Sequence, residues 1–343
     1  MKTKIKKIGL ILILAVLFGI IIFLAIEVAG KKAMLKNSQV ELTSPDLEDL
    51  VSENSGEVII YKGERYVYNN NITSILCMGI DVDKEHGSGD VIGEFGQADM
   101  LMLAILDTKS GEVTLWNISR DSMTEVDVYN VDGEFVKTEN MQACLAFAYG
   151  DGAHKSCENT VKAVSRLLYG IPIQSYAVLD LDAIRPLNDA IGGVEVTIQE
   201  DDILSKDFVP NTTVLLLGDA VESYVRFRMT EMPGEPIDSN NNRMDRQRRY
   251  MIGFLQKALQ MTKQDITTPV TLFNIARKDN HMITNLNVSR VAYLTTIFSK
   301  INFSGDIFQT VPGEVVAGEI YAEYHVDDEA LYQMILDTFY VKQ

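Results

Sequence analysis

Two apolar runs separated by a short polar segment predict a β-hairpin in the middle of the chain. The first run covers residues 100–106, and the second follows a turn-prone Asp-Thr-Lys-Ser-Gly segment, at residues 112–118. Two such runs around a cluster of turn residues are typical of paired antiparallel strands. If the turn is centred near Lys109 and Ser110, the numbers of paired residues sum to about 218 or 219. This register places Asp99 beside Arg120 at the open end of the hairpin.

The rest of the pattern predicts one α/β domain. A third apolar strand, at residues 74–80, would end with Asp81 at the same edge as Asp99 if it pairs antiparallel with the run at 100–106. Continuous apolar strands are typical of sheets covered on both faces, so we expect a three-layer α/β/α fold with a central mixed sheet. Other strands are predicted near 57–68 (a hairpin), 175–181, 194–198 and 308–311, and helices near 141–149, 159–168, 219–228, 242–261, 288–299 and 327–340.

The N-terminus predicts a transmembrane helix. Four lysines within the first seven residues precede an uncharged run at residues 8–26. This run is long enough for a spanning helix of about 20 residues and exceeds the apolar core of a signal peptide, about 7–15 residues. A cleaved signal peptide is the alternative. Lysines on both sides of the run give only weak support for a cytoplasmic N-terminus.

The predicted organisation is therefore that of a single-pass protein of the cell membrane. Residues 1–32 would form a cytoplasmic tail and anchor, residues 33–73 a stalk with short leading strands, and residues 74–343 one extracytoplasmic domain. No second uncharged run of spanning length follows the first in the sequence.

The charge of the chain argues against nucleic acid as a partner. Residues 33–343 carry 25 of the 31 basic and 47 of the 48 acidic residues, a net charge of −22. So acidic a surface repels a polyanion. The cysteines Cys77, Cys144 and Cys157 lack the spacing of a metal site. We expect Cys77 to be a buried thiol, and a disulfide between Cys144 and Cys157 is left open.

Arginines are concentrated in one stretch of this acidic chain. Six of the twelve arginines lie at positions 226, 228, 243, 246, 248 and 249. Arg243, Arg246 and Gln247 have spacings that place them on one face at the start of a helix, where free N–H groups favour an anion. Arg226 and Arg228 end the preceding predicted helix. Because the planar guanidinium binds phosphate through two parallel hydrogen bonds, we expect these residues to form an anion site, and Arg248 and Arg249 to be solvated.

Carboxylates close to these arginines predict a phosphate site with a divalent cation. Asp81 and Asp99 would supply the hard oxygen ligands that Mg²⁺ prefers, with Mn²⁺ as a possible substitute, and Arg120 would bind the phosphoryl charge. Other catalytic designs find no support, because the four histidines lack zinc spacing and the sequence contains no Gly-x-Ser-x-Gly, Walker or dinucleotide-binding motif.

Seven short motifs in order resemble the LytR-CpsA-Psr family. They are Met78-Gly79-Ile80-Asp81, Ala98-Asp99-Met100-Leu101-Met102-Leu103, Ile118-Ser119-Arg120-Asp121-Ser122, Ala143 to Gly150, Ile191-Gly192-Gly193-Val194, Tyr224-Val225-Arg226-Phe227-Arg228 and Arg243-Met244-Asp245-Arg246-Gln247. Each motif is weak alone, but the ordered set, which covers about residues 74–260, is specific.

The resemblance implies a membrane-anchored enzyme of the kind found mainly in Gram-positive bacteria. Members move glycopolymers such as teichoic acids or capsule from an undecaprenyl pyrophosphate carrier to peptidoglycan, with the lipid tail in an apolar tunnel between sheet and helices. By position, Asp81 and Asp99 match the metal-binding aspartates of the family. The positions that match its pyrophosphate-contacting residues are Arg120, Arg226, Arg228, Arg243 and Gln247.

Three positions depart from the family pattern. Gln97 and Asp83 stand where the family usually has arginine, and Ser119 stands in the place of a proline. Fewer arginines would weaken phosphate binding.

Our leading hypothesis is an Mg²⁺-dependent phosphotransferase in which Arg120 stabilises charge and Asp121 either accepts a proton or orients Arg120. Two alternatives remain open. One is a non-catalytic regulatory protein of the cell envelope that holds polyprenyl phosphate, and the other is a metal-dependent pyrophosphatase of lipid carriers.

Overall fold

The computed structural model describes residues 28–34, 42–80, 96–130, 132–200, 208–227, 239–278, 281–298, 307–318 and 321–343. The uncharged run at residues 8–26, Asp81 and Arg228 lie outside these ranges. In the described ranges, no helix combines the length and the apolar composition that crossing a bilayer requires.

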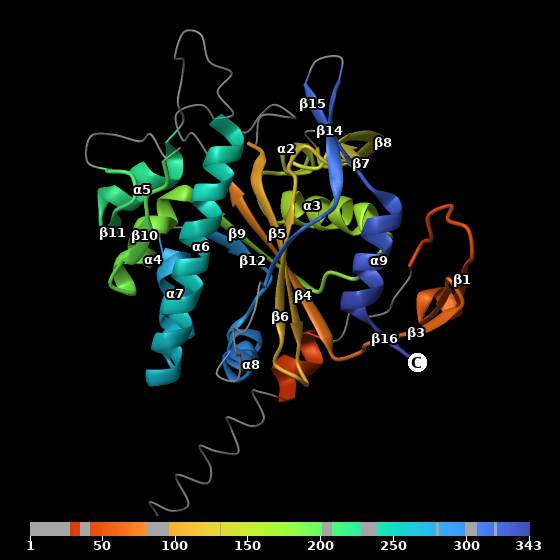
Figure 1. Ribbon diagram of the computed structural model, residues 1–343, viewed down its shortest axis with the longest axis horizontal. Helices are drawn as coiled ribbons and strands as arrows, with labels where there is room; N and C mark the ends of the chain where they lie inside the picture. The colour runs from red at the N-terminus through yellow and green to blue at the C-terminus, as the bar shows by residue number, and fades with distance from the viewer. Residues whose placement is uncertain are drawn as a thin grey trace, which may run out of the picture.

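A six-stranded mixed sheet forms the centre of the fold (Figure 1). Its strands, in spatial order, are β12 (Met282–Thr284), β9 (Ser175–Asp180), β4 (Ile72–Ile80), β5 (Ala98–Asp107), β6 (Val113–Ile118) and β13 (Phe308–Thr310). β9 runs parallel to β4, and β13 runs parallel to β6. The other neighbouring pairs are antiparallel.

The hairpin register predicted from the sequence is confirmed. Leu101 pairs with Ile118 and Leu106 pairs with Val113, so the numbers in each pair sum to 219. The carboxylate of Asp107 fixes the turn by accepting hydrogen bonds from the backbone N–H groups of Lys109 (2.7 Å) and Ser110 (3.0 Å). This local capping, typical of aspartate in turns, holds the strands in one register.

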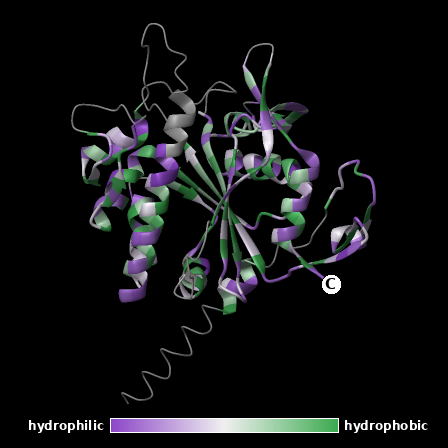
Figure 2. Ribbon diagram, in the orientation of Figure 1, coloured by the Kyte–Doolittle hydropathy of each residue, from purple (hydrophilic) through white to green (hydrophobic). Residues whose placement is uncertain are grey.

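Helices cover both faces of the sheet, as predicted. On one face, Leu103 and Trp116 are fully buried in a core shared with α3 (His154–Leu167) and α9 (Asp328–Phe339), and Trp116 packs edge-to-face on Phe339 with the ring centroids 5.5 Å apart. On the other face, Leu106 packs with α8 (Val288–Phe298) and Met102 with α6 (Ser239–Gln264). Figure 2 shows hydrophobic and hydrophilic residues interspersed around these helices, as expected for helices with one buried side.

Three shorter helices pack around α6. They are α4 (Ile184–Ala190), α5 (Asp219–Arg226) and α7 (Thr268–Arg277). A two-stranded ribbon of β10 (Val194–Thr197) and β11 (Thr213–Leu216) completes this side of the domain. Figure 1 shows this group on the side of the sheet where β9 and β12 lie.

One predicted helix is mostly wrong. Residues 141–149 contain the end of a strand, β8 (Phe135–Gln142), followed by the short helix α2 (Leu145–Ala148). β8 pairs with β7 (Met123–Tyr129) in a hairpin that the sequence does not reveal. The side chains of residues 135–140 are all exposed, so this strand lacks the apolar alternation by which strands are recognised.

The N-terminal part of the described chain packs on the domain. β1 (Leu50–Glu53), β2 (Val58–Tyr61) and β3 (Glu64–Tyr68) form a small sheet with the C-terminal strand β16 (Tyr340–Lys342). The predicted hairpin with Lys62 and Gly63 at its tip is confirmed. Leu42, in the predicted stalk, is only 6% exposed and contacts the main core.

Candidate functional site

Arg120 lies at the open end of the β5–β6 hairpin and is held by three acceptors. Its Nη1 atom forms an ion pair with Asp99, as the register predicts. Its Nη2 atom donates a hydrogen bond of 2.5 Å to Oε1 of Gln97, and its Nε atom lies 3.6 Å from Oδ1 of Asp121. The side chains of Arg120, Asp99 and Asp121 are 21%, 30% and 28% exposed. The guanidinium is thus oriented by neighbouring oxygens but remains accessible to an anion.

Backbone hydrogen bonds through Cys144 fix this arrangement. The N–H of Cys144 donates to the carbonyl of Arg120 (3.0 Å), and the carbonyl of Cys144 accepts from the N–H of Ala98 (3.2 Å). The Sγ atom lies 3.8 Å from Oε1 of Gln97, and burial raises the pKa of the thiol. Cys144 and Cys157 are free thiols, so the structure does not contain the disulfide that the sequence left open.

Arg226 is the last residue of α5 and lies at the same end of the sheet. Its Nη2 atom donates a hydrogen bond of 2.9 Å to Oδ1 of Asp182, which follows β9. Both side chains are partly exposed, 38% for Arg226 and 45% for Asp182. Such a pair is readily exchanged for a more highly charged partner such as phosphate.

The prediction that Arg246 contacts pyrophosphate is not supported by its position. Arg246 is only 3% exposed, and it donates hydrogen bonds from Nε to the carbonyl of Tyr224 (3.2 Å) and from Nη2 to that of Phe227 (2.5 Å). The adjacent Gln247 donates from Nε2 to the carbonyl of Val225 (3.1 Å). These bonds satisfy carbonyl groups that the end of α5 leaves without helical partners. Arg246 therefore positions the helix that carries Arg226.

The remaining predicted residues differ in what the structure describes. Asp81 and Arg228 lie outside the described residues, and Arg243 lies in α6 at a position whose side chain is not described. Arg249 donates from Nε to the hydroxyl of Tyr224 (3.3 Å), whereas Arg248 lies over the ring of Phe308 with 5.8 Å between its Cζ atom and the centroid. Arg248 is exposed, as predicted, whereas Arg249 is partly buried and bonded to Tyr224, contrary to the prediction.

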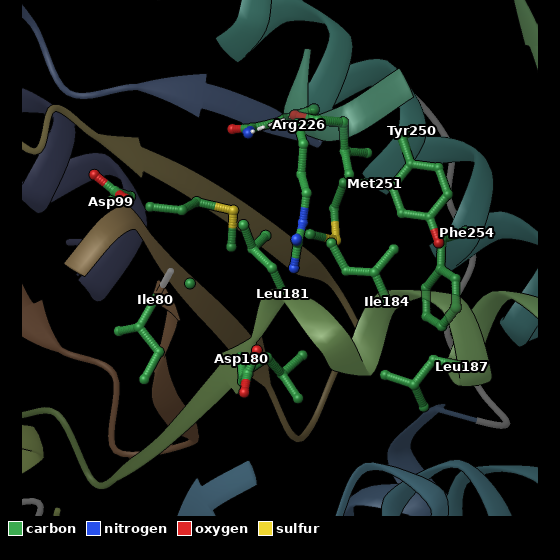
Figure 3. A pocket seen from close by; sticks show the side chains of 15 residues that line it. Ile80, Asp99, Asp180, Leu181, Ile184, Leu187, Arg226, Tyr250, Met251 and Phe254 are labelled. Atoms are coloured by element: carbon green, nitrogen blue, oxygen red, sulfur yellow. Dashed lines mark hydrogen bonds between the residues drawn. The ribbon is translucent and has the colours of Figure 1, made fainter. Parts of the chain in front are cut away.

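An apolar cavity opens beside Asp99 and Arg226 (Figure 3). Its walls come from β4, β9, α4 and α6, and they include Ile80, Leu179, Ile184, Leu187, Met251 and Phe254. Figure 3 shows the side chain of Arg226 extending toward Leu181 and Asp180, among these apolar groups. A cation at the mouth of an apolar space suits a ligand with an anionic head and an apolar tail.

A second cavity lies on the other side of β5. It is bordered by β5, β6, β13 and α6, and we call it the polar cavity because Asn117, Arg120, Arg248 and Thr310 make its lining the more polar of the two, although much of its wall is apolar. Four residues border both cavities, namely Asp99, Met100, Gln247 and Met251. Asp99 and Gln247 therefore stand where the apolar and the polar cavities meet.

A group of possible metal ligands that sequence reasoning missed lies beside Arg226. In the described part of the chain, Asp180, Asp182 and His281 have ligand atoms that all lie within 4.8 Å of one another. Nδ1 of His281 is 3.7 Å from Oδ2 of Asp180. The group depends on the antiparallel pairing of β12 with β9, which brings together residues about 100 positions apart. The sequence does not indicate that β12 and β9 pair.

Comparison with known proteins agrees with the fold and the motifs. The profile of the LytR_cpsA_psr family matches residues 30–337. The polyisoprenyl-teichoic acid–peptidoglycan teichoic acid transferase TagU of Enterococcus faecalis is 26% identical over 267 residues, which are 76% of this chain and 77% of that protein.

Solved structures share the fold. Protein gbs0355 from Streptococcus agalactiae has a TM-score of 0.59 and 21% identity, with coverage of 77% of this chain and 85% of that one. B. subtilis TagT has a TM-score of 0.55 and 17% identity, with coverage of 78% and 89%. Because the family profile spans most of the sequence and the ordered motifs agree with it, this chain belongs to the LytR-CpsA-Psr family.

Proposed function

We propose that the protein transfers a glycopolymer from a polyprenyl pyrophosphate carrier to peptidoglycan. The observation that carries the proposal is that Arg226 and Asp99 border an apolar cavity, while Arg120, paired with Asp99, borders the adjoining polar cavity. The apolar cavity, of about 140 Å³, suits the part of the polyprenyl tail next to the diphosphate, and the arginines suit the diphosphate itself. Family membership and the transferase name of the E. faecalis relative support the same reaction. Teichoic acid and capsule are both candidate polymers.

The chemical step is a phosphoryl transfer. A hydroxyl oxygen of the acceptor forms a bond to the phosphorus that carries the glycan. The bond from this phosphorus to the bridging oxygen breaks, and undecaprenyl phosphate leaves with the bonding electrons. The hydroxyl proton passes to a base, for which Asp121 is the candidate because its carboxylate lies next to Arg120.

The arginines stabilise the charge that develops on the phosphoryl oxygens. To do so, Arg120 exchanges Asp99 and Gln97 for phosphate, and Arg226 exchanges Asp182 for it. Of the partners that are exchanged, Asp99 borders both cavities. Most of the rate enhancement then comes from positioning and electrostatics.

Mg²⁺, or Mn²⁺ in its place, is part of the proposal. Asp99, together with Asp81, would hold the ion, which would supply positive charge to the diphosphate. The carboxylate of Asp99 fits this role because it is partly exposed and stands where the two cavities meet. We also propose that residues 8–26 anchor the protein in the cell membrane with its C-terminal domain outside, since this run is uncharged and of spanning length.

The proposal is tested by supplying the purified full chain with lipid-linked teichoic acid precursor and peptidoglycan. We expect glycan to become covalently attached and undecaprenyl phosphate to be released, and Arg120→Ala to reduce both by at least about 100-fold. Arg65→Ala, which removes an exposed arginine in β3, is the matched control and should retain activity.

Other products would identify the alternatives. Release of undecaprenyl phosphate and free glycan phosphate without attachment to peptidoglycan would indicate a pyrophosphatase, and lipid binding without any turnover would indicate a regulatory protein. Unreduced transfer by Arg120→Ala would contradict the proposed site.

A further inference from the structure

We propose that the polar cavity bordered by β5, β6, β13 and α6 binds the acceptor sugar of peptidoglycan. This inference rests on the proposed function and adds the place from which the attacking hydroxyl enters. It follows from the chemistry of the cavity lining and from the position of the cavity relative to the apolar one.

The lining of the polar cavity suits a sugar. The cavity has a volume of about 340 Å³, within the range of about 300 to 1,000 Å³ that is common for small-molecule sites. Asn117 contributes an amide from β6, and Thr310 contributes a hydroxyl from β13. These groups can both donate to and accept from sugar hydroxyls.

Two of these polar groups are available to a ligand. In the described part of the chain, the side chains of Asn117 and Thr310 have no hydrogen-bond partner. Gln309 is not part of this set, because its Oε1 atom accepts a hydrogen bond of 3.1 Å from Nε1 of Trp116, which lies on the opposite face of the sheet. Phe308 and Met251 supply apolar wall against which the C–H groups of a sugar ring can pack.

The two cavities lie on opposite sides of β5. The apolar cavity is bounded by β4 and β9 and the polar cavity by β6 and β13, whereas β5 and α6 contribute to both. In phosphoryl transfer, the attacking and the leaving oxygens are roughly in line on opposite sides of the phosphorus. If the leaving lipid phosphate has its tail in the apolar cavity, the attacking hydroxyl must approach from the side where the polar cavity lies.

The residues where the two cavities meet agree with this direction of attack. Asp99 and Gln247 border both cavities, whereas Arg226 borders only the apolar cavity and Arg120 only the polar one. A diphosphate at the junction would therefore have the leaving phosphate near Arg226 and the reacting phosphorus near Arg120. The acceptor oxygen forms the new bond to that phosphorus while the bond to the bridging oxygen breaks.

The test uses near-isosteric variants that remove polar groups from the cavity, Asn117→Leu and Thr310→Val. Transfer by the full chain is measured with lipid-linked donor and a soluble peptidoglycan disaccharide, each varied in turn. We expect the KM for the disaccharide to rise about tenfold or more, because each lost hydrogen bond weakens binding by that order. The KM for the donor and any cleavage with water as acceptor should remain unchanged.

Two control variants separate this effect from general damage. Thr114→Val removes a hydroxyl from the same strand, β6, at a position outside the polar cavity, and should change neither KM. Ile184→Ala enlarges the apolar cavity and should raise the KM for the donor alone. Circular dichroism of each variant checks that the domain is folded.

An unchanged KM for the disaccharide in both Asn117→Leu and Thr310→Val would overturn the inference, as would a parallel rise in the KM for the donor. If the wild-type chain transfers nothing, the proposed function fails, and the cavity is then tested by saturation-transfer NMR with the disaccharide. Binding by the wild type that Asn117→Leu abolishes would support the inference, and equal signals from the two proteins would overturn it.

Discussion

The guanidinium of Arg120 forms an ion pair with the carboxylate of Asp99 across the open end of the β5–β6 hairpin. The residue proposed to bind phosphate and a residue proposed to bind the metal thus neutralise each other in the free protein. Substrate must separate them. A cation that takes Asp99 would release Arg120 for phosphate, and phosphate that takes Arg120 would release Asp99 for the cation.

This relationship predicts that diphosphate and Mg²⁺ bind cooperatively. Removing the charge of Asp99 with Asp99→Asn should raise the affinity for inorganic pyrophosphate without Mg²⁺, because Arg120 is then released. The enhancement by Mg²⁺ should disappear in the same variant, since a ligand of the ion is lost. Calorimetric titration of wild type and variant, with and without Mg²⁺, measures both effects.

Asp182→Asn is the matched comparison, because Asp182 pairs with Arg226 and not with Arg120. It should raise the affinity for pyrophosphate and leave the enhancement by Mg²⁺ in place. A fall in affinity for metal-free pyrophosphate in Asp99→Asn would contradict the proposal that Asp99 competes with pyrophosphate for Arg120.

Gln97 places a neutral side chain next to Arg120, and a charged residue at this position should change phosphate binding. Because its Oε1 atom accepts a hydrogen bond from Arg120, Gln97→Glu should strengthen the hold on the guanidinium and weaken pyrophosphate binding by about tenfold. Gln97→Arg should remove the acceptor, add a phosphate ligand and raise the affinity. Equilibrium binding and transfer rates of the two variants test this, and equal affinities would exclude a role of Gln97 at the site.

Arg246 and Arg248 provide a matched pair for stability. Arg246→Ala removes buried hydrogen bonds to the carbonyl groups of Tyr224 and Phe227 and should lower the free energy of unfolding by about 2 to 4 kcal/mol. Arg248→Ala should change it by less than about 1 kcal/mol, since Arg248 is exposed. Urea unfolding distinguishes the two, and equal losses would mean that Arg246 does not hold α5 in place.

The hairpin register, the third apolar strand and the main helices could be predicted because local patterns specify them. Asp107 fixes the turn by its own hydrogen bonds, and residues 75–80 of β4 and 100–106 of β5 are continuous apolar runs. The position of Asp99 beside Arg120 follows from that register alone. Site geometry that depends on one hairpin was therefore accessible from the sequence.

Site geometry that depends on contacts between distant parts of the chain could not be predicted from the sequence. Helical spacing showed correctly that Arg246 and Gln247 point in similar directions, but it does not tell whether a helix face meets a ligand or another helix. Both residues turned out to bond to the end of α5. To predict the group of Asp180, Asp182 and His281, one must know which strand pairs with β9.

A buried aspartate in the β7–β8 hairpin predicts how the stability of the fold depends on pH. Asp127, in β7, is only 1% exposed. Although burial opposes its ionisation, hydrogen bonds from Lys162, Thr138 and Arg166 lower its pKa to about 2. Because the folded pKa lies below the ordinary value, the carboxylate stabilises the fold above about pH 4, and this contribution is lost as the pH falls toward 2.

Asp127→Asn should therefore lower the free energy of unfolding at pH 7 by about 2 kcal/mol and flatten the loss of stability between pH 4 and 2. Glu125→Gln, at an exposed position of the same strand, is the control and should have little effect. Thermal unfolding as a function of pH measures both. An unchanged pH profile in Asp127→Asn would contradict the assignment.

Native mass spectrometry of the full chain extracted from bacterial membranes tests whether the apolar cavity holds a polyprenyl ligand. We expect one polyprenyl phosphate or pyrophosphate bound per wild-type chain, and its loss in Ile184→Trp, which fills the apolar cavity. Ala190→Trp, at an exposed position of the same helix, should retain the lipid. Absence of a polyprenyl ligand from the wild type, or equal occupancy in Ile184→Trp, would contradict the account.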